Sequence, residues 1–74
     1  GITANAILPG WIETAMTEPA FNWDRFSDAV KPRIPARRWG NPDDFGGIAV
    51  YIMSDASSYH TGDTFLIDGG YFLF

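Results

Sequence analysis

Pro9, Gly10, Trp11, Ile12 and Thr14 have the residue types and the spacing to bind a phosphate or a carboxamide. They follow an apolar run, so a strand would enter a Pro-Gly corner, with a hydroxyl residue four positions after the glycine. In an open α/β sheet, the loop that leaves the carboxyl end of a strand is where a dinucleotide lies. Proline presets φ, glycine allows a close backbone approach, and threonine offers a hydroxyl and a backbone amide. Because Pro-Gly is foremost a turn signal, an ordinary strand-to-loop turn is the alternative.

The other polar residues indicate little chemistry. His60 is the single histidine and there are 0 cysteines, so a metal site or a nucleophile–histidine pair lacks partners, and we expect His60 at the surface. Arg37 and Arg38 could grip a phosphate, but an ion pair or cap with Asp43 and Asp44 is the better expectation. The sequence therefore predicts no catalytic residue and no metal ligand in this chain.

Composition narrows the classes of partner. The formal net charge is −4, from 5 basic and 9 acidic residues, so no basic patch is expected to bind a nucleic acid. No apolar run approaches the ~20 residues that span a bilayer, and we expect no signal peptide. Among 74 residues, 46% are hydrophobic, including 3 Trp, 6 Phe and 3 Tyr, which is more than so small a body hides easily. We expect part of a larger fold or a segment that packs against other chains, and the absence of cysteine fits a cytoplasmic protein.

Two segments read as short strands of a parallel sheet. Residues 2–8 and 64–68 are apolar on both faces, which is typical of strands buried on both sides. Asp68-Gly69-Gly70 could be a phosphate or metal loop, but we expect a tight turn after the second strand. The apolar tail 71–74 is expected to contact another surface.

Helices are predicted between these strands. Residues 11–21 read as loop with one helical turn, and a short helix is expected from an N-cap at Asn22 to Pro32. A longer helix over 42–54 follows an N-cap at Asn41. This helix is apolar nearly all round, so we expect it to be buried on two sides.

Four motifs stand in order along nearly the whole chain. They are Asn5 with Pro9-Gly10 and Thr14, Arg38-Trp39-Gly40-Asn41-Pro42-Asp43-Asp44, Ser54-Asp55-Ala56-Ser57-Ser58-Tyr59-His60-Thr61-Gly62, and Asp68-Gly69-Gly70. With this spacing the chain resembles the carboxyl-terminal third of the short-chain dehydrogenase/reductase family. The resemblance implies an α/β fold, namely the carboxyl-terminal part of a Rossmann-like, doubly wound parallel sheet with two strands, substrate-lid helices and one long helix. The family's glycine-rich turn, catalytic serine and Tyr-x3-Lys pair have no counterpart in the sequence.

The resemblance also divides the chain into parts. Residues 1–14 would be a strand and cofactor loop, 15–40 a substrate lid, and 41–74 a helix, the last strand and an oligomer tail. The implied cofactor is NAD or NADP, and the residue that selects between them lies upstream in such proteins. Backbone atoms near Ile12 would bond the nicotinamide carboxamide, and Thr14 would touch the carboxamide or the pyrophosphate.

Large apolar residues lie in and beside the lid. Trp11, Met16 and Trp23 are assigned to the substrate lid by the resemblance. Trp11 could close one side of the active site or simply cover the core. Met16, Phe21, Trp23 and Phe26 could line a substrate pocket, and the alternative is that they form the lid's own small core.

The implied activity belongs to the whole parent protein. It would be an NAD(P)-dependent oxidoreductase that interconverts an alcohol and a ketone on a sugar, polyol or 3-oxoacyl substrate, and the isolated chain would be inactive. Its partners would be the remainder of the dehydrogenase domain and further copies of itself. The helix over 42–54, the strand over 64–68 and the tail would form a homo-oligomer interface, most simply in a tetramer. The alternative is a non-catalytic packing or oligomerisation segment.

Overall fold

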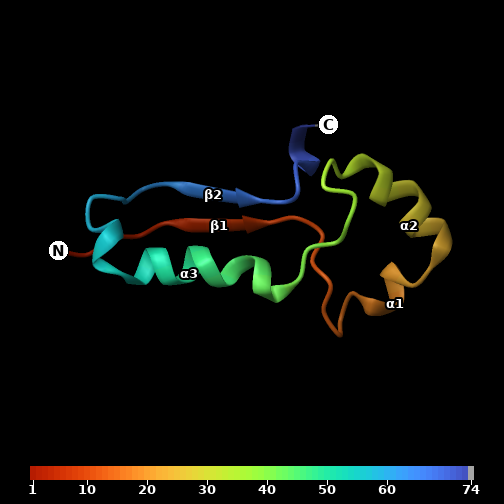
Figure 1. The fold of residues 1–74 in the computed structure, drawn as a ribbon, viewed down its shortest axis with the longest axis horizontal. Coiled ribbons are helices and arrows are strands. Elements are labelled where there is room, and N and C mark those ends of the chain that lie inside the picture. Colours follow the sequence, from red (N-terminus) through yellow and green to blue (C-terminus); the bar gives the residue numbers. More distant parts are fainter. Residues whose placement is uncertain (74) are drawn as a thin grey trace.

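Two short strands form a parallel sheet in the structure, a computed structural model that describes residues 1–73 (Figure 1). Strand β1 is Ala6–Pro9 and strand β2 is Thr64–Ile67. Their register pairs Ala6 with Thr64 at one end and Pro9 with Ile67 at the other. The α-helices lie between the strands in the sequence and supply the crossover that a parallel pair requires. The predicted α/β class is therefore confirmed.

Strand β1 is shorter than the predicted 2–8, because the residues before it bond to a turn. Ala4 N–H donates to Thr61 Oγ1 at 3.0 Å. The side chain of Asn5 bonds backbone groups at both ends of the turn 60–63, at 3.1 and 2.9 Å. This polar clamp fixes the start of β1 against the segment that leads into β2.

The helices occupy two positions relative to the sheet (Figure 1). Helix α3, Gly46–Met53, runs alongside the strands, whereas α1, Glu18–Phe21, and α2, Asp24–Val30, lie beyond the carboxyl ends of both strands. Single turns of 3₁₀ helix are η1 (Lys31–Arg33), η2 (Pro42–Phe45), η3 (Asp55–Ser57) and η4 (Tyr71–Leu73). The chain thus separates a sheet-and-helix part from a small helical part.

The predicted N-cap at Asn22 is wrong. Trp23 holds the extended N-cap position of α2, and no side chain caps that helix. Asn22 instead closes α1, since its backbone N–H donates to the Glu18 carbonyl at 2.9 Å. The extra helical turn just before α2 moves the cap by one residue.

The predicted helix over 42–54 is divided, although its cap is confirmed. Asn41 Oδ1 accepts from Asp43 N–H at 3.0 Å, and Asn41 N–H donates to Asp44 Oδ2 at 2.8 Å. These reciprocal bonds form a capping box, and η2 is the 3₁₀ turn that follows it. The α-helical part begins only at Gly46, consistent with the tighter turns that often open helices.

Little of the chain is shielded by its own residues. Within residues 1–73, Phe21 and Ile34 are the buried apolar side chains, at 7% and 2% exposure. The Cα radius of gyration is 14.7 Å, whereas a compact domain of this length has about 11 Å. The structure therefore agrees with the expectation of a segment that packs against further protein.

Helix α3 presents apolar side chains outward, and none of its residues is buried by residues 1–73, so the predicted burial on two sides stays a prediction. Val50 is 70% exposed and Met53 is 88% exposed, while Tyr51 is half-buried. In the tail, Phe72 and Leu73 are exposed, and Phe74 lies outside the described residues. No helix in the described part of the chain is both long and apolar enough to cross a membrane.

Candidate functional site

A single parallel bridge joins the loop after β1 to the segment that leads into η2. Ile12 pairs with Gly40: the Gly40 N–H donates to the Trp11 carbonyl at 2.9 Å, and Glu13 N–H donates to the Gly40 carbonyl at 2.7 Å. In this bridge Trp11 and Glu13, the neighbours of Ile12, make the hydrogen bonds to Gly40. The N–H and C=O of Ile12 therefore point to the opposite side. The Ile12 N–H has no acceptor within residues 1–73. Ile12 therefore presents one donor and one acceptor at the carboxyl edge of the sheet.

That pair of groups fits a primary carboxamide, which also has one acceptor and one set of donors. A nicotinamide head group carries such a carboxamide on its ring. A free backbone donor beside a carbonyl with a second lone pair can orient such a ring without any side-chain contact.

Gly10 makes a close contact within the chain itself. A Cβ at this position would lie 2.6 Å from Asp68 Cβ and 2.8 Å from Asp68 Cα. The lack of a side chain therefore lets the loop after β1 pass directly over the end of β2. This close approach is to the chain itself, and the predicted approach of Gly10 to a cofactor stays a prediction.

Thr14 lies at the start of the turn that leads into α1. Its backbone carbonyl accepts from Thr17 N–H at 3.1 Å and from Glu18 N–H at 2.9 Å. Its hydroxyl makes only long contacts, at 3.3 Å with the Thr17 N–H and 3.4 Å with Thr17 Oγ1. The side chain is exposed, so the Thr14 hydroxyl is open to a ligand.

Trp11 joins the loop to the helical part and to the C-terminal turn. Its ring meets Phe26 of α2 edge-on at 5.4 Å and Tyr71 of η4 edge-on at 6.2 Å. Trp11 is 37% exposed, so one part of the indole packs and another part faces outward. Both readings of Trp11, a wall of the site and a cover for the core, agree with this position.

The small core of the helical part has different members from those expected. Phe21 and Phe26 belong to it, and Trp39 stacks on Phe21 with ring centroids 4.0 Å apart. Met16 is 91% exposed and Trp23 is 59% exposed, so these two side chains are outside that core. Trp39 belongs to this core although it lies outside the helices, in the segment before η2. The helical spacing of apolar residues therefore did not predict its place there.

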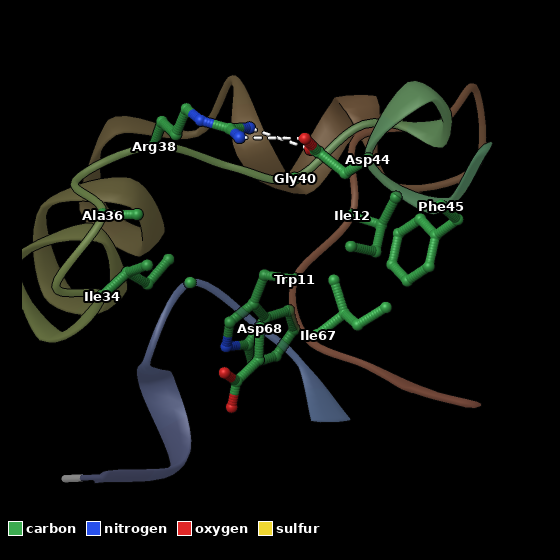
Figure 2. A pocket seen from close by; sticks show the side chains of 11 residues that line it. Trp11, Ile12, Ile34, Ala36, Arg38, Gly40, Asp44, Phe45, Ile67 and Asp68 are labelled. Atoms are coloured by element: carbon green, nitrogen blue, oxygen red, sulfur yellow. Dashed lines mark hydrogen bonds and ion pairs between the residues drawn. The ribbon is translucent and has the colours of Figure 1, made fainter. Parts of the chain in front are cut away.

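A cavity of about 140 Å³ lies beneath the bridge between Ile12 and Gly40 (Figure 2). Figure 2 shows the ion pair of Arg38 with Asp44 on one side of the ring of lining side chains, and Trp11 and Asp68 on the opposite side. The two terminal guanidinium nitrogens of Arg38, Nη1 and Nη2, donate to the Asp44 carboxylate at 2.9 Å. The hydrogen bond from Arg38, followed by the one from the Asn41 N–H, lowers the pKa of Asp44 to about 2. The expected ion pair is thus present, and it involves Arg38 and Asp44.

Asp68-Gly69-Gly70 is a tight turn, as preferred from the sequence. Asp68 Oδ1 accepts from Gly70 N–H at 2.9 Å and Oδ2 accepts from Phe72 N–H at 2.8 Å. Both glycines have positive φ, 65° and 92°. The carboxylate is therefore occupied with the backbone of its own turn, as a turn-forming aspartate is.

His60 is half-buried and not simply a surface residue. Its Nδ1 lies 2.8 Å from the Tyr51 hydroxyl and its Nε2 lies 2.6 Å from Asp63 Oδ2. The hydrogen bond with His60, then the one from the Thr64 N–H, lowers the pKa of Asp63. No group of three or more metal-binding side chains occurs in the part of the chain that the structure describes. His60 thus ties α3 to the turn before β2, far from the loop after β1 along the strands.

Comparison with known proteins identifies the family. A family profile described as Enoyl-(Acyl carrier protein) reductase matches residues 1–72. The chain is 49% identical over 71 residues to 2-dehydro-3-deoxy-D-gluconate 5-dehydrogenase of Pseudoalteromonas atlantica, which covers 96% of this chain and 28% of that protein. The chain belongs to the short-chain dehydrogenase/reductase family. The predicted resemblance and Rossmann-like fold are thereby confirmed.

Other members of the short-chain dehydrogenase/reductase family match to a similar extent. L-rhamnose-1-dehydrogenase of Scheffersomyces stipitis is 42% identical over 99% of this chain and 28% of that enzyme. The crystal structure of a gluconate 5-dehydrogenase from Burkholderia cenocepacia, in complex with NADP and tartrate, has a TM-score of 0.90 and 38% identity. It matches 100% of this chain and 29% of the crystallised chain. The sequence therefore spans under a third of the length of these short-chain dehydrogenase/reductase relatives.

Sequence reasoning missed one residue of the loop. Thr17 Oγ1 donates to the Ile12 carbonyl at 2.8 Å and accepts from the Thr14 N–H at 2.8 Å. A signal was present, since Thr17-Glu18-Pro19 has the residue types of a helix N-terminus. That signal would have placed Thr17 beside α1, but not its bond back to Ile12.

Proposed function

We propose that the protein carrying this segment transfers a hydride between NAD or NADP and an alcohol or ketone carbon. The observation that carries the proposal is the outward-facing N–H and C=O of Ile12, supported by the exposed hydroxyl of Thr14 beside them. The hydride chemistry is supplied by the nicotinamide when it is bound. The Ile12 backbone would hold the carboxamide and so fix the angle at which the ring meets the substrate.

The proposed division of labour follows the three parts of the chain. Residues 1–14, with Pro9 and Gly10 at the corner, would form one wall of the cofactor site. Residues 15–40 would form the substrate lid, which in such enzymes excludes water from the reaction. Residues 41–74 would support the sheet edge and contact other subunits. Proton transfer would depend on residues outside these 74, so the isolated chain is expected to be inactive.

A sugar, a polyol or a sugar acid is the proposed substrate class. The support comes from relatives whose names specify 2-dehydro-3-deoxy-D-gluconate, gluconate and L-rhamnose. A 3-oxoacyl substrate is the second possibility within the same alcohol–ketone chemistry. The description of the matching profile names an acyl carrier protein, but its enoyl substrate is reduced at a C=C bond and not at a ketone, so the sugar class is preferred. The exposed Trp11, Met16 and Trp23 would face this substrate when the lid is closed.

We also propose a homo-oligomer, most simply a tetramer, in the cytoplasm. The outward side chains of α3 and of the C-terminal turn support it, since Val50, Met53, Phe72 and Leu73 are all exposed. Apolar surface of this kind marks contacts, and symmetric self-association is the commonest way to cover it. The rest of the dehydrogenase domain is the other partner that these surfaces require.

Replacement of Thr14 by valine in the full-length protein tests the cofactor site. Thr14→Val removes the hydroxyl at similar size, and a lost hydrogen bond to a charged group costs roughly 1.5–3 kcal/mol, so the Kd for NAD(P)H should rise at least about tenfold. The Kd is measured by nicotinamide fluorescence, and turnover is followed with a panel of sugars, polyols and their ketones.

Thr64→Val is the matched control. Thr64 lies on β2, and its hydroxyl makes no hydrogen bond to another residue between 1 and 73. An unchanged Kd in Thr14→Val would remove Thr14 from the site. A full-length protein that binds neither NADH nor NADPH would favour the alternative of a packing or oligomerisation segment.

A further inference from the structure

The hydroxyl of Thr17 joins the two backbone groups that flank Glu13. Its single proton is donated to the Ile12 carbonyl at 2.8 Å, which is nearer than the Thr14 carbonyl at 3.2 Å. Its oxygen accepts the Thr14 N–H, also at 2.8 Å. One side-chain atom therefore closes the turn from 12 to 17.

This arrangement changes which groups the loop can offer to a ligand. The Thr14 N–H is already bonded, so Thr14 can contribute only its hydroxyl. The Ile12 carbonyl keeps one lone pair, because a carbonyl oxygen has two and Thr17 uses one. The Ile12 N–H has no acceptor within residues 1–73.

We infer that Thr17 is a positioning residue for the nicotinamide, acting through the Ile12 carbonyl and the Thr14 amide. By fixing both, Thr17 sets the direction in which the Ile12 donor and acceptor face. It leaves the hydroxyl as the only donor that Thr14 itself can offer. The inference rests on the proposed function. Thr17 itself does not touch the cofactor: it orders the backbone that does, which lowers the entropy lost when the cofactor binds.

The local anchoring of Thr17 supports this role. Its own N–H donates to the Thr14 carbonyl at 3.1 Å, and the Phe21 N–H donates to the Thr17 carbonyl at 3.0 Å. Thr17 is thus the residue that precedes α1 and is fixed by the first turn of that helix. The hydroxyl reaches back from the helix to the loop, so the turn behaves as one unit.

The test compares Thr17→Val, Thr17→Ser and the control Thr64→Val in the full-length protein. Without cofactor, hydrogen exchange of the Thr14 amide is measured. Thr17→Val should accelerate it, and Thr17→Ser should restore the parent rate, because serine keeps the hydroxyl. With cofactor, the Kd for NAD(P)H should rise about two- to tenfold in Thr17→Val, the range expected for one neutral hydrogen bond, and return in Thr17→Ser. The KM for the alcohol should stay unchanged.

The outcomes separate this inference from the proposed function. A parent protein that binds and turns over cofactor, with the same Kd in Thr17→Val, overturns the role of Thr17 and leaves the function standing. A parent protein that binds no nicotinamide overturns both. A loss of affinity that Thr17→Ser fails to restore shows that the hydroxyl is not the cause. If Thr17→Val does not fold by circular dichroism, Thr17→Ala replaces it, with the same expected results.

Discussion

Replacing Gly10 by alanine would test the contact between the loop after β1 and the end of β2. The new Cβ would lie 2.6 Å from Asp68 Cβ and 2.8 Å from Asp68 Cα, closer than such atoms approach in proteins. Gly10 does not have a positive φ, so alanine is compatible with its backbone, and the cost arises from the clash alone. Because Asp68 Cα belongs to the backbone, relief requires the strands to shift. Overpacking of this kind costs about 1–3 kcal/mol.

Gly40→Ala is the matched control, since its Cβ would also come within 2.6 Å of a neighbour. That neighbour is Ile12 Cδ1, the end of a flexible side chain, which can leave its preferred rotamer for about 0.5–1.5 kcal/mol. Both changes reduce the entropy of the unfolded chain equally, so this effect cancels in the comparison.

The melting temperature of the full-length protein distinguishes the two variants. A relative in which 71 residues make up 28% has about 250 residues, and a protein of that size loses about 2–4 °C per kcal/mol. Gly10→Ala should therefore lower Tm by about 2–12 °C. Gly40→Ala should lower it less, at the same protein concentration. A Tm loss in Gly40→Ala that equals or exceeds the loss in Gly10→Ala would refute the reasoning.

Two further predictions concern charge and assembly. The Arg38 hydrogen bond lowers the pKa of Asp44 to about 2, so its stabilising effect is complete above the unfolded value of 3.8 and is lost as the pH falls through about 2. Arg38→Met should make the free energy of unfolding depend less steeply on pH in this acid range, measured by urea titration, and parallel curves for parent and variant would contradict it. Val50→Asp should lower the mass of the full-length oligomer by light scattering at low micromolar concentration, because Val50 is 70% exposed on α3. Ser58→Asp, on an exposed polar residue, should keep the parent mass, and an unchanged mass in Val50→Asp would remove α3 from the interface.

Features set by neighbouring residues were predictable from the sequence. The Asn41 cap and the pairing of Arg38 with Asp44 depend on residues within six positions of one another. The two strands were predictable because each segment is apolar on both faces, which is typical of parallel sheets, although residues 1–73 leave β1 exposed. Such signals are local, and the structure bears them out.

Features that depend on distant residues were not predictable in the same way. Gly10 has the residue type of a ligand-binding corner, but its close neighbour is Asp68, which is 58 positions away. Trp39 lies in a motif that reads as a connector, yet its ring stacks on Phe21 of α1. The N-cap at Asn22 failed for a smaller reason, since the preceding turn of α1 used that residue first. In each case the three-dimensional neighbour decides the role of the residue.

Residues 34–40, the last part of the proposed lid, are attached at two points to the loops that follow β1 and β2. Gly40 bridges to Ile12, and Ala36 N–H donates to the Gly69 carbonyl at 3.0 Å, with Ile34 buried beside that turn. Helices α1 and α2 lie beyond both attachments (Figure 1). A movement of α2 that preserves the two attachments and the hydrogen bond from Thr17 to the Ile12 carbonyl leaves the Ile12 backbone where it is. In the proposed lid, any movement over the substrate would therefore belong to α2, and residues 12–17 would supply the fixed backbone edge for the nicotinamide.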